Sequence, residues 1–191
     1  VVRGRVRAYV ERAGIMAEIR ATTKAAEEGA KTSIRIKANA VHDRQIIEAL
    51  YAASCAGVQI EVVTRRMCGI RPGVEDMSEH IRVRSVLGRF LEHSRFFIFR
   101  RGKETRHFLG SADLLPRNLD HRIEVVTPVA APELCRELDA IFAALLADNT
   151  QSWDLGSDGS WVRARPPKGE KARTAQSDLM ARARSRARAR R

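Results

Sequence analysis

The sequence is short of cysteine and of long apolar runs, and each shortage excludes a class of protein. Its three cysteines, Cys55, Cys68 and Cys135, form no Cys-x-x-Cys pair. This argues against a metal cluster or a disulfide framework and favours a reducing, cytoplasmic compartment. No stretch approaches the roughly 18 apolar residues that span a bilayer, so we expect no membrane span. The first residue is valine, which leaves room for the chain to be a piece of a longer protein.

Basic residues outnumber acidic ones, but the excess is concentrated near the C-terminus. Residues 163–191 hold eleven Lys/Arg and two Asp/Glu, which accounts for +9 of the net charge of +12. The rest is nearly balanced, which weakens an assignment as a nucleic-acid-binding domain. Residues 166–191 are too charged to bury a core. We predict that they form a disordered basic tail that binds polyanions nonspecifically and contributes nothing to chemistry.

Composition and periodicity divide the chain into one domain and three flanking segments. We predict a single α/β domain over residues 15–150, with a mixed β-sheet flanked by helices. An irregular N-terminal segment (1–14) precedes it, and a loop extension (151–165) separates it from the basic tail.

A strand, a helix and a second strand follow one another early in the domain. Residues 32–38 alternate apolar and polar, residues 43–56 carry an apolar helical stripe, and VQIEVV (58–63) is the second strand. At this spacing the two strands are parallel. Ligands bind at the carboxyl ends of such strands, so residues 64–66 mark the expected binding edge.

The remaining pattern predicts five further elements. They are a helix over 15–29, a strand over 81–86, a β-hairpin of 95–99 with 105–110, a strand over 121–129 and a helix over 131–147.

One histidine, His93, stands among arginines at the end of the run VLGRFLEHSR. Arginines on either side favour a neutral imidazole, which suits contact with a phosphate. A small-residue turn that ends in Asp113 follows the second hairpin strand and meets His93 at one edge, where Asp113 or Glu92 could orient the ring. A lone histidine is more often a structural hydrogen-bonding residue, so both interpretations stay open.

Arginines gather at the same expected edge. The planar guanidinium group matches phosphate oxygens two at a time. Any single arginine is more often a solvated surface charge, and Arg122 beside Glu124 could simply pair across the sheet. Their convergence nevertheless predicts phosphate handling. The arginines concerned are Arg65, Arg66, Arg71, Arg89, Arg95, Arg117 and Arg122.

Two short motifs at this edge resemble those of the phospholipase D-like superfamily in an altered form. That superfamily carries His-x-Lys and Gly-Ser-x-Asn on neighbouring strands. Here Arg95 replaces the lysine, Arg100 stands where an aspartate of the motif would fall, and Asp113 replaces the asparagine. These departures argue against a working phosphodiesterase half-site, but not against the fold.

A longer resemblance, from about Ile15 to Arg163, is to the last domain of bacterial polyphosphate kinase of the first type. It rests on ALYAASCAGV (49–58), FLEHSR (90–95) and SADLLPRNLDHRIEV (111–125). Such kinases transfer the terminal phosphate of ATP reversibly to polyphosphate, with magnesium, through a phosphohistidine on the preceding domain of a phospholipase D-like pair. That domain is absent from this sequence. The resemblance therefore implies an inactive isolated chain, with magnesium ligands elsewhere in the enzyme.

The resemblance also implies roles for individual residues. Arg65 and His93 match the family's ATP-contacting residues. Arg65 would neutralise charge on the transferred phosphoryl group, and His93 would contact the phosphate and act catalytically, for example by shuttling a proton. Arg66 stands where the family usually has glycine. Together with Arg95, Arg117 and Arg122 it is a candidate for lining the polyphosphate.

The implied partners are ATP or ADP, inorganic polyphosphate and the N-terminal domains of the same enzyme, and the sequence also allows a homo-oligomer. Two other functions stay open. One is a phospholipase D-like nuclease or lipase whose half-sites pair by dimerisation. The other is a non-catalytic module that binds polyphosphate or nucleic acid through its basic tail.

Overall fold

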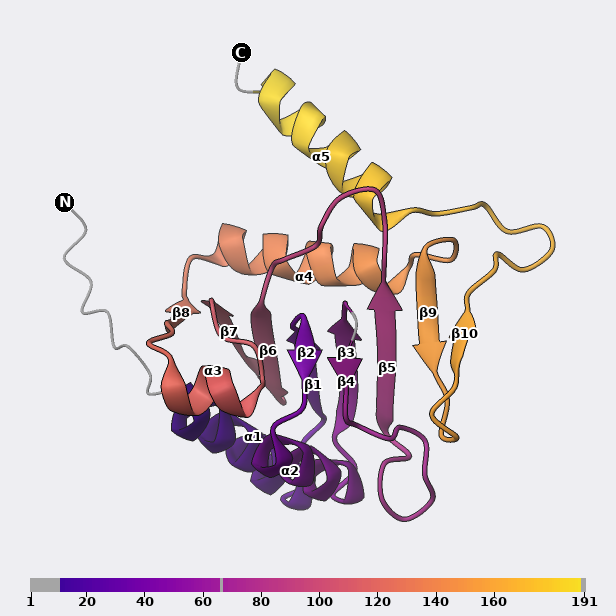
Figure 1. The fold of residues 1–191 in the computed structure, drawn as a ribbon. Helices are drawn as coiled ribbons and strands as arrows, with labels where there is room; N and C mark the ends of the chain where they lie inside the picture. Colours follow the sequence, from indigo (N-terminus) through magenta and orange to yellow (C-terminus); the bar gives the residue numbers. More distant parts are fainter. Residues whose placement is uncertain (1–10, 66, 190–191) are drawn as a thin grey trace, which may run out of the picture.

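The computed structural model describes residues 11–65 and 67–189 and has an eight-stranded mixed sheet with helices on both faces (Figure 1). The α/β prediction is confirmed. The strand order is β10-β9-β5-β3-β1-β6-β7-β8, and β2 and β4 form a separate parallel pair. The strands are β1 (Thr32–Lys37), β2 (Ala40–Val41), β3 (Gln59–Thr64), β4 (Met67–Cys68), β5 (Ile81–Val86), β6 (Phe96–Arg101), β7 (Glu104–Gly110), β8 (Val126–Val129), β9 (Ser152–Leu155) and β10 (Trp161–Arg163). The helices are α1 (Glu11–Glu27), α2 (Arg44–Cys55), α3 (Pro116–His121), α4 (Pro132–Leu146) and α5 (Ala175–Ala189).

The predicted strand–helix–strand unit forms the centre of the sheet. β1 pairs in parallel with β3, and β3 in parallel with β5, while β6 and β7 add the predicted antiparallel hairpin. Between β1 and β3, α2 begins at an N-cap where the Asp43 carboxylate accepts a hydrogen bond from the Ile46 amide at 3.1 Å. It ends before Gly57, whose φ of 87° suits glycine.

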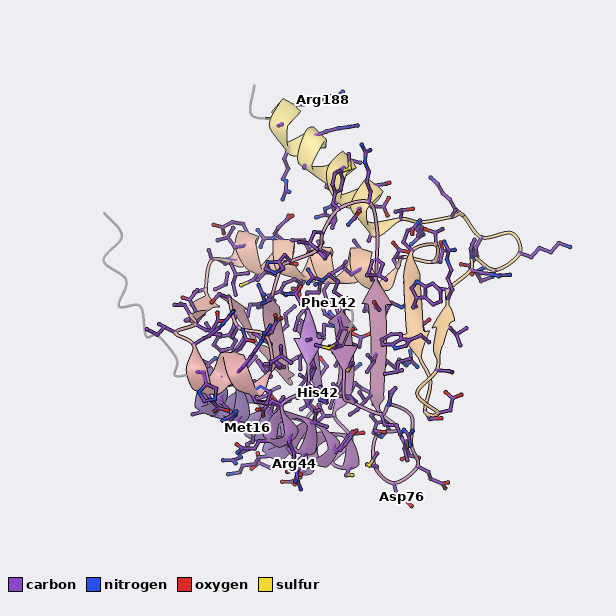
Figure 2. The ribbon with its side chains drawn as sticks, in the orientation of Figure 1. Met16, His42, Arg44, Asp76, Phe142 and Arg188 are labelled. Carbon is purple, nitrogen blue, oxygen red and sulfur yellow. The ribbon has the colours of Figure 1, made fainter. Side chains whose placement is uncertain are left out.

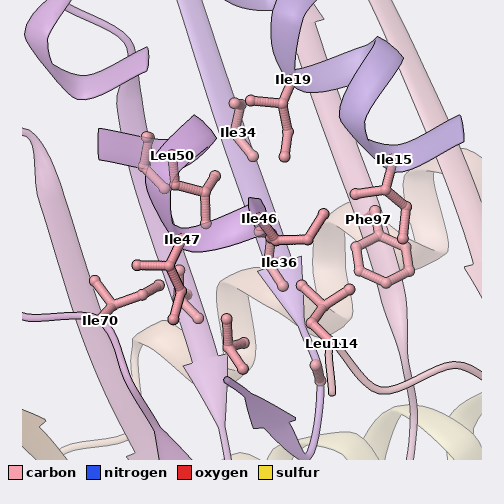
Figure 3. Packing of buried hydrophobic residues seen from close by; sticks show 14 of the residues in the cluster. Ile15, Ile19, Ile34, Ile36, Ile46, Ile47, Leu50, Ile70, Phe97 and Leu114 are labelled. Carbon is pink, nitrogen blue, oxygen red and sulfur yellow. The ribbon is translucent and has the colours of Figure 1, made fainter. Parts of the chain in front are cut away.

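Alternating side chains on the central strands build one hydrophobic layer on each face of the sheet. On one face, Ile34 and Ile36 of β1 pack with Ile46 of α2 (Figure 3). On the other face, Phe96 of β6 packs with Phe142 of α4, with ring centroids 6.0 Å apart; Figure 2 labels Phe142. Both layers exclude water, so the sheet offers its edges rather than its central faces for chemistry.

Two flanking predictions differ from the structure. Residues 11–14 of the expected irregular segment belong to α1, and residues 1–10 lie outside the described residues. The expected loop extension contains a hairpin in which β9 pairs with both β5 and β10. Its Gly- and Ser-rich middle is the hairpin turn, with Gly159 at φ 85°. The strands are only four and three residues long, too short for a clear alternating pattern.

The strand predicted over 121–129 is also shorter than expected. The structure confines β8 to residues 126–129, preceded by α3, which has proline in its first turn. Pro128 is tolerated because β8 is the edge strand beyond β7.

The basic tail is not disordered as predicted, because residues 175–189 form α5 (Figure 1, yellow). Alanine and arginine have high helix propensity. Arg182 and Arg186 pair with Glu137 of α4 at 3.6 and 2.5 Å, and Ala175 is fully buried in the second hydrophobic layer. The first turn of α5 is therefore part of the domain, whereas Arg188 projects at its far end (Figure 2).

Over residues 11–65 and 67–189, none of the helices combines the length and apolar character needed to cross a bilayer. Cys55, Cys68 and Cys135 are free thiols. Burial raises the pKa of Cys68 to about 11, which keeps this thiol protonated and unreactive near neutral pH.

Replacing Phe142 tests the second hydrophobic layer. Phe142→Ala should lower the free energy of unfolding by about 3–5 kcal/mol, because it opens a cavity between α4 and β6. The control is Leu134→Ala on the same helix, where the leucine is 55% exposed and the change should be within about 0.5 kcal/mol. Urea denaturation measures both, and equal losses would contradict this packing.

Candidate functional site

Several chain segments end or begin at one edge of the large sheet. Lys37 ends β1, Arg65 follows β3, His93 precedes β6 and Asp113 follows the end of β7. β1 and β3 are parallel, and β6 runs antiparallel to both β1 and β7, so all four positions reach the same edge. Strand direction thus brings together residues that are far apart in the sequence.

Asp113 ties three of these segments together. Its carboxylate accepts hydrogen bonds from the Asn39 backbone amide at 2.8 Å and from the Asn39 side chain at 3.2 Å. It also accepts two from the Arg95 guanidinium, at 2.9 and 3.0 Å. Burial raises the pKa of Asp113, but the hydrogen bonds from Arg95 and Asn39 outweigh it and hold that pKa below its usual value. The carboxylate is therefore charged near neutral pH.

His93 lies exposed beside the other side of the same arginine. The Arg95 terminal nitrogens lie 3.4 Å from Nδ1 and 3.3 Å from Nε2 of the ring, and one of them donates to the His93 carbonyl at 3.3 Å. The predicted orientation by Asp113 or Glu92 is wrong, because among the described residues neither carboxylate bonds the ring: Asp113 accepts from Asn39 and Arg95, and Glu92 accepts from Ser94 at 2.5 Å. The imidazole faces a guanidinium instead, and its exposed side is accessible from solvent.

Arg65 sits just past the end of β3 with part of its guanidinium unpaired. Its backbone amide donates to the Asn39 carbonyl at 3.3 Å, and its carbonyl accepts from the Ser85 hydroxyl at 2.8 Å. The terminal nitrogen Nη1 is buried and has no hydrogen-bond partner among the described residues. A buried guanidinium nitrogen without an acceptor is costly, so an anionic ligand would satisfy it.

Lys37 belongs to this edge although no sequence pattern indicated it. The side chain is fully buried, and Nζ donates to the Ser94 carbonyl at 3.3 Å. Burial lowers the pKa of Lys37 to about 8. The charges of Arg65 and Arg95 lower it further, and those of Glu92 and Asp113 oppose the shift. Both arginines and both carboxylates are thus within electrostatic reach of one buried ammonium group, and the edge keeps a net positive charge.

The four residues predicted to line polyphosphate are not equivalent. Arg66 lies outside the described residues. Arg95 is bound to Asp113, with a side chain only 13% exposed. Arg117 is exposed on α3, and Arg122 is exposed after it, 3.9 Å from Glu124. Arg122 therefore pairs with Glu124, which was the alternative to lining polyphosphate in the sequence analysis. Arg122 does not lie in a strand, however, so the pair is not formed across the sheet.

A metal site does not form from the described residues. No group of three His, Cys, Asp or Glu side chains among them converges on one point. The two carboxylates nearest to the edge are bound to Arg95 and Ser94. These residues therefore do not fit a magnesium ion, which needs oxygen ligands that are free to bind it.

A groove of about 510 Å³ lies elsewhere, between α1 and α2. Its lining carries charges of both signs, including Arg20, Lys24, Glu27 and Glu48. This mixture gives no net attraction for a phosphate, so the sheet edge remains the better candidate for an anion.

Comparison with protein families and with individual relatives gives a consistent result. A family model described as polyphosphate kinase C-terminal domain 2 matches residues 6–176. A polyphosphate kinase from Synechocystis is 50% identical over 81% of this chain and 21% of its own length. One from Mycolicibacterium gilvum is 48% identical over 92% of this chain and 24% of its own length. The chain thus spans about a fifth to a quarter of these curated relatives.

Solved structures give the same picture for the fold. The crystal structure of polyphosphate kinase from Porphyromonas gingivalis matches 95% of this chain and 28% of its own, with a TM-score of 0.88 and 31% identity. Nuc from Salmonella typhimurium, a phospholipase D family member, matches 72% of this chain and 91% of its own, with a TM-score of 0.51 and 22% identity. The second match supports the phospholipase D-like fold alone.

Replacing Asp113 tests its role as the tie at this edge. Asp113→Asn should lower the free energy of unfolding at pH 7 by about 3 kcal/mol, because Arg95 loses its buried counter-charge. The pKa of Asp113 is depressed in the folded state. The carboxylate therefore contributes fully to the free energy of unfolding at pH values above its pKa in the unfolded chain, about 4. This stability contribution is lost as the pH falls through the pKa of Asp113 in the folded chain.

Urea denaturation at pH 7 and pH 3 checks this prediction, because the difference between wild type and variant should shrink in acid. Glu48→Gln, which affects only the exposed Arg44–Glu48 pair, is the control and should change nothing measurable. A difference that does not depend on pH would contradict the role given to Asp113.

Replacing Lys37 tests its buried charge. Between pH 8 and about 10.5 the unfolded chain holds a proton on Lys37 that the folded chain has released. Wild-type stability should therefore rise across this window relative to Lys37→Met. At about 1.4 kcal/mol per pKa unit, the expected gain is on the order of 3 kcal/mol.

The measurement is the free energy of unfolding of both proteins at pH 7, 9 and 10.5. Lys24→Met on α1 is the control, because the Lys24 side chain is 76% exposed. Parallel curves for wild type and Lys37→Met would rule out a neutralised lysine.

Proposed function

The chain belongs to the family of polyphosphate kinase C-terminal domains, and we propose that it forms the ATP-binding half of an active site within a longer kinase. The match over residues 6–176 and the relatives named above support this assignment. The observation that carries it is the buried, unpaired Arg65 Nη1 at an edge that also holds Lys37 and His93. ATP or ADP and inorganic polyphosphate are the proposed substrates.

The positive edge is suited to the terminal phosphates of a nucleotide. Arg65 offers a guanidinium nitrogen that lacks an acceptor among the described residues, and Lys37 adds a buried ammonium charge nearby. Asp113 neutralises Arg95 and holds it rigid, so the net positive charge is carried by Arg65 and Lys37. Such fixed charges stabilise the charge that develops on a phosphoryl group in flight, without reorganising during the reaction.

The reaction proposed for the whole enzyme is a reversible two-step transfer. The bond between the terminal phosphorus of ATP and its bridging oxygen breaks, and a bond from that phosphorus to a histidine ring nitrogen forms as ADP leaves. The terminal oxygen of polyphosphate then attacks the same phosphorus, which lengthens the polymer by one phosphate and frees the histidine. The phosphorylated histidine would belong to a preceding domain outside this chain, so the isolated chain is expected to be inactive.

His93 is proposed to contact the transferred phosphate rather than to carry it. Its ring is exposed, and the Arg95 guanidinium lies beside it at 3.3–3.4 Å. An imidazole in this position can donate a hydrogen bond to a phosphate oxygen or move a proton as the phosphorus changes partner. Magnesium is expected to arrive with ATP, held by groups beyond the described residues.

A phosphodiesterase is the less favoured function. Two of the three residues that depart from the phospholipase D-like motif, Arg95 and Asp113, are bound to each other through two hydrogen bonds. Neither is free to serve as the lysine and asparagine of that motif would. The altered positions thus form a structural tie rather than half of a phosphodiesterase site.

Replacements of Arg65 and His93 in the full-length kinase test the proposal. Arg65→Ala should lower polyphosphate synthesis by roughly 10²–10³-fold, because a preorganised positive group is lost. His93→Ala should abolish synthesis. Phosphate transfer from labelled ATP into acid-insoluble polymer measures both rates.

The matched control is Arg82→Ala, which removes an exposed arginine of β5 far along the strand from this edge. It should leave synthesis within about twofold. Undiminished turnover in His93→Ala, or an equal loss in all three variants, would refute the assigned roles.

A further inference from the structure

The loop between β5 and β6, residues 87–95, carries His93 and contains no helix or strand. Its ends are held by the body of the domain. The Leu87 amide donates to the Gln151 carbonyl at 3.0 Å, and the Ser94 carbonyl accepts from Lys37. The middle of the loop projects Phe90 and Leu91, whose side chains are 50% and 74% exposed. Packing against the core therefore does not fix the segment just before His93.

One side chain from the C-terminal helix reaches this unsupported segment. Gln176 of α5 accepts a hydrogen bond from the Phe90 amide at 2.9 Å and donates one to the Phe90 carbonyl at 2.7 Å. Among the described residues, the hydrogen bonds that reach the backbone of residues 88–92 come from Gln176. Both polar backbone groups of Phe90 are thus satisfied by one amide, three residues before His93.

The loop is shaped to receive this side chain. A Cβ atom added at Gly88 would lie 2.5 Å from Gln176 Oε1, closer than two unbonded atoms can approach. The φ of Gly88 is not in the left-handed region, so the lack of a side chain, rather than backbone conformation, makes glycine suitable here. Any larger residue at position 88 would push the Gln176 amide away from Phe90.

Other contacts dock the start of α5 independently of Gln176. Ala175 is fully buried, and its amide donates to the Asp148 carboxylate at 2.8 Å. Asn149 accepts from the Arg173 amide at 2.7 Å and donates to the Lys171 carbonyl at 3.2 Å. The Gln176 side chain is therefore not needed to hold the helix, and its two hydrogen bonds act on the loop. The family match also ends at residue 176.

We infer that Gln176 is a positioning residue for the phosphate-handling site: it clamps Phe90 and thereby sets the place of His93. The composition of the basic tail suggested that it contributes nothing to the chemistry. The first turn of α5 nevertheless supports the loop that carries His93. The arginine-rich remainder of α5 has no part in this clamp. The inference rests on the proposed function, since it assigns His93 to phosphate transfer.

A double-mutant cycle in the full-length kinase tests the clamp, with Gly88→Ala and Gln176→Ala made singly and together. Each single variant should raise the amide hydrogen exchange of residues 88–94 roughly tenfold, as expected from the loss of one or two hydrogen bonds. Each should lower kcat roughly 10- to 100-fold, because the histidine is misplaced, with a smaller change in the KM for ATP. The double variant should be no worse than either single one, because the added methyl group at position 88 has room once the Gln176 side chain is gone.

The matched control is Arg186→Ala, which breaks an ion pair of the same helix with Glu137 and should leave both readouts unchanged. Additive losses in the double variant, or unchanged exchange and kcat in Gln176→Ala, would overturn the inference. So would a rise in the exchange of residues 175–189 in Gln176→Ala, since the side chain would then be holding the helix. If the wild-type enzyme transfers no phosphate, the proposed function fails, and the exchange of residues 88–94 still decides whether the clamp exists.

Discussion

The Arg95–Asp113 ion pair is the interaction on which the edge of the sheet depends. It joins the start of β6 to the turn after β7, and the same carboxylate holds Asn39 at the end of β1. β1, β6 and β7 are paired along their lengths, and this carboxylate adds the side-chain contacts that join the segments just beyond the strand ends. The pair also gives the His93 ring a fixed surface to rest on, because the ring lies against the outer side of the Arg95 guanidinium. Two of the positions that depart from the phospholipase D-like motif therefore form a bidentate ion pair that makes this edge rigid.

Local sequence patterns were sufficient for the centre of the fold. The alternation in β1, the apolar stripe and N-cap of α2, and the hairpin of β6 and β7 are local signals, and strand direction alone placed Arg65, His93 and Asp113 at one edge. Lys37 was not predicted as a residue of this edge, because a lysine at the end of a strand normally faces water. Its burial depends on the loop before β6, which lies more than fifty residues away in the chain. The role of Gln176 was not predicted for a similar reason, since nothing near it in the sequence indicates a contact with Phe90.

The tail shows how composition can mislead. Judged alone, eleven basic residues in the last 29 repel one another and predict disorder. In the structure Glu137 pairs with Arg182 and Arg186, while Asp148 and a buried alanine hold the first turn. The high helix propensity of alanine and arginine then favours helix in the rest of α5, where these two residues make up positions 181–189 apart from Ser185. A segment of one charge can fold when a few opposite charges and one apolar contact are supplied from distant parts of the chain.

Buried charges are fully paired in one part of the molecule and incompletely paired in another. This difference distinguishes a structural cluster from the candidate functional site. Glu18 of α1 is buried between Arg101 and Arg106, so its charge is balanced twice over. The sheet edge differs in that positive groups are left incompletely paired: the Lys37 ammonium is buried within reach of two arginines as well as Glu92 and Asp113, and Arg65 Nη1 has no acceptor among the described residues. Evolution retains such a cost where it supports function. An anion bound between Arg65 and Lys37 would supply negative charge there, so the free-energy cost of holding these positive groups together would become affinity for a phosphate group.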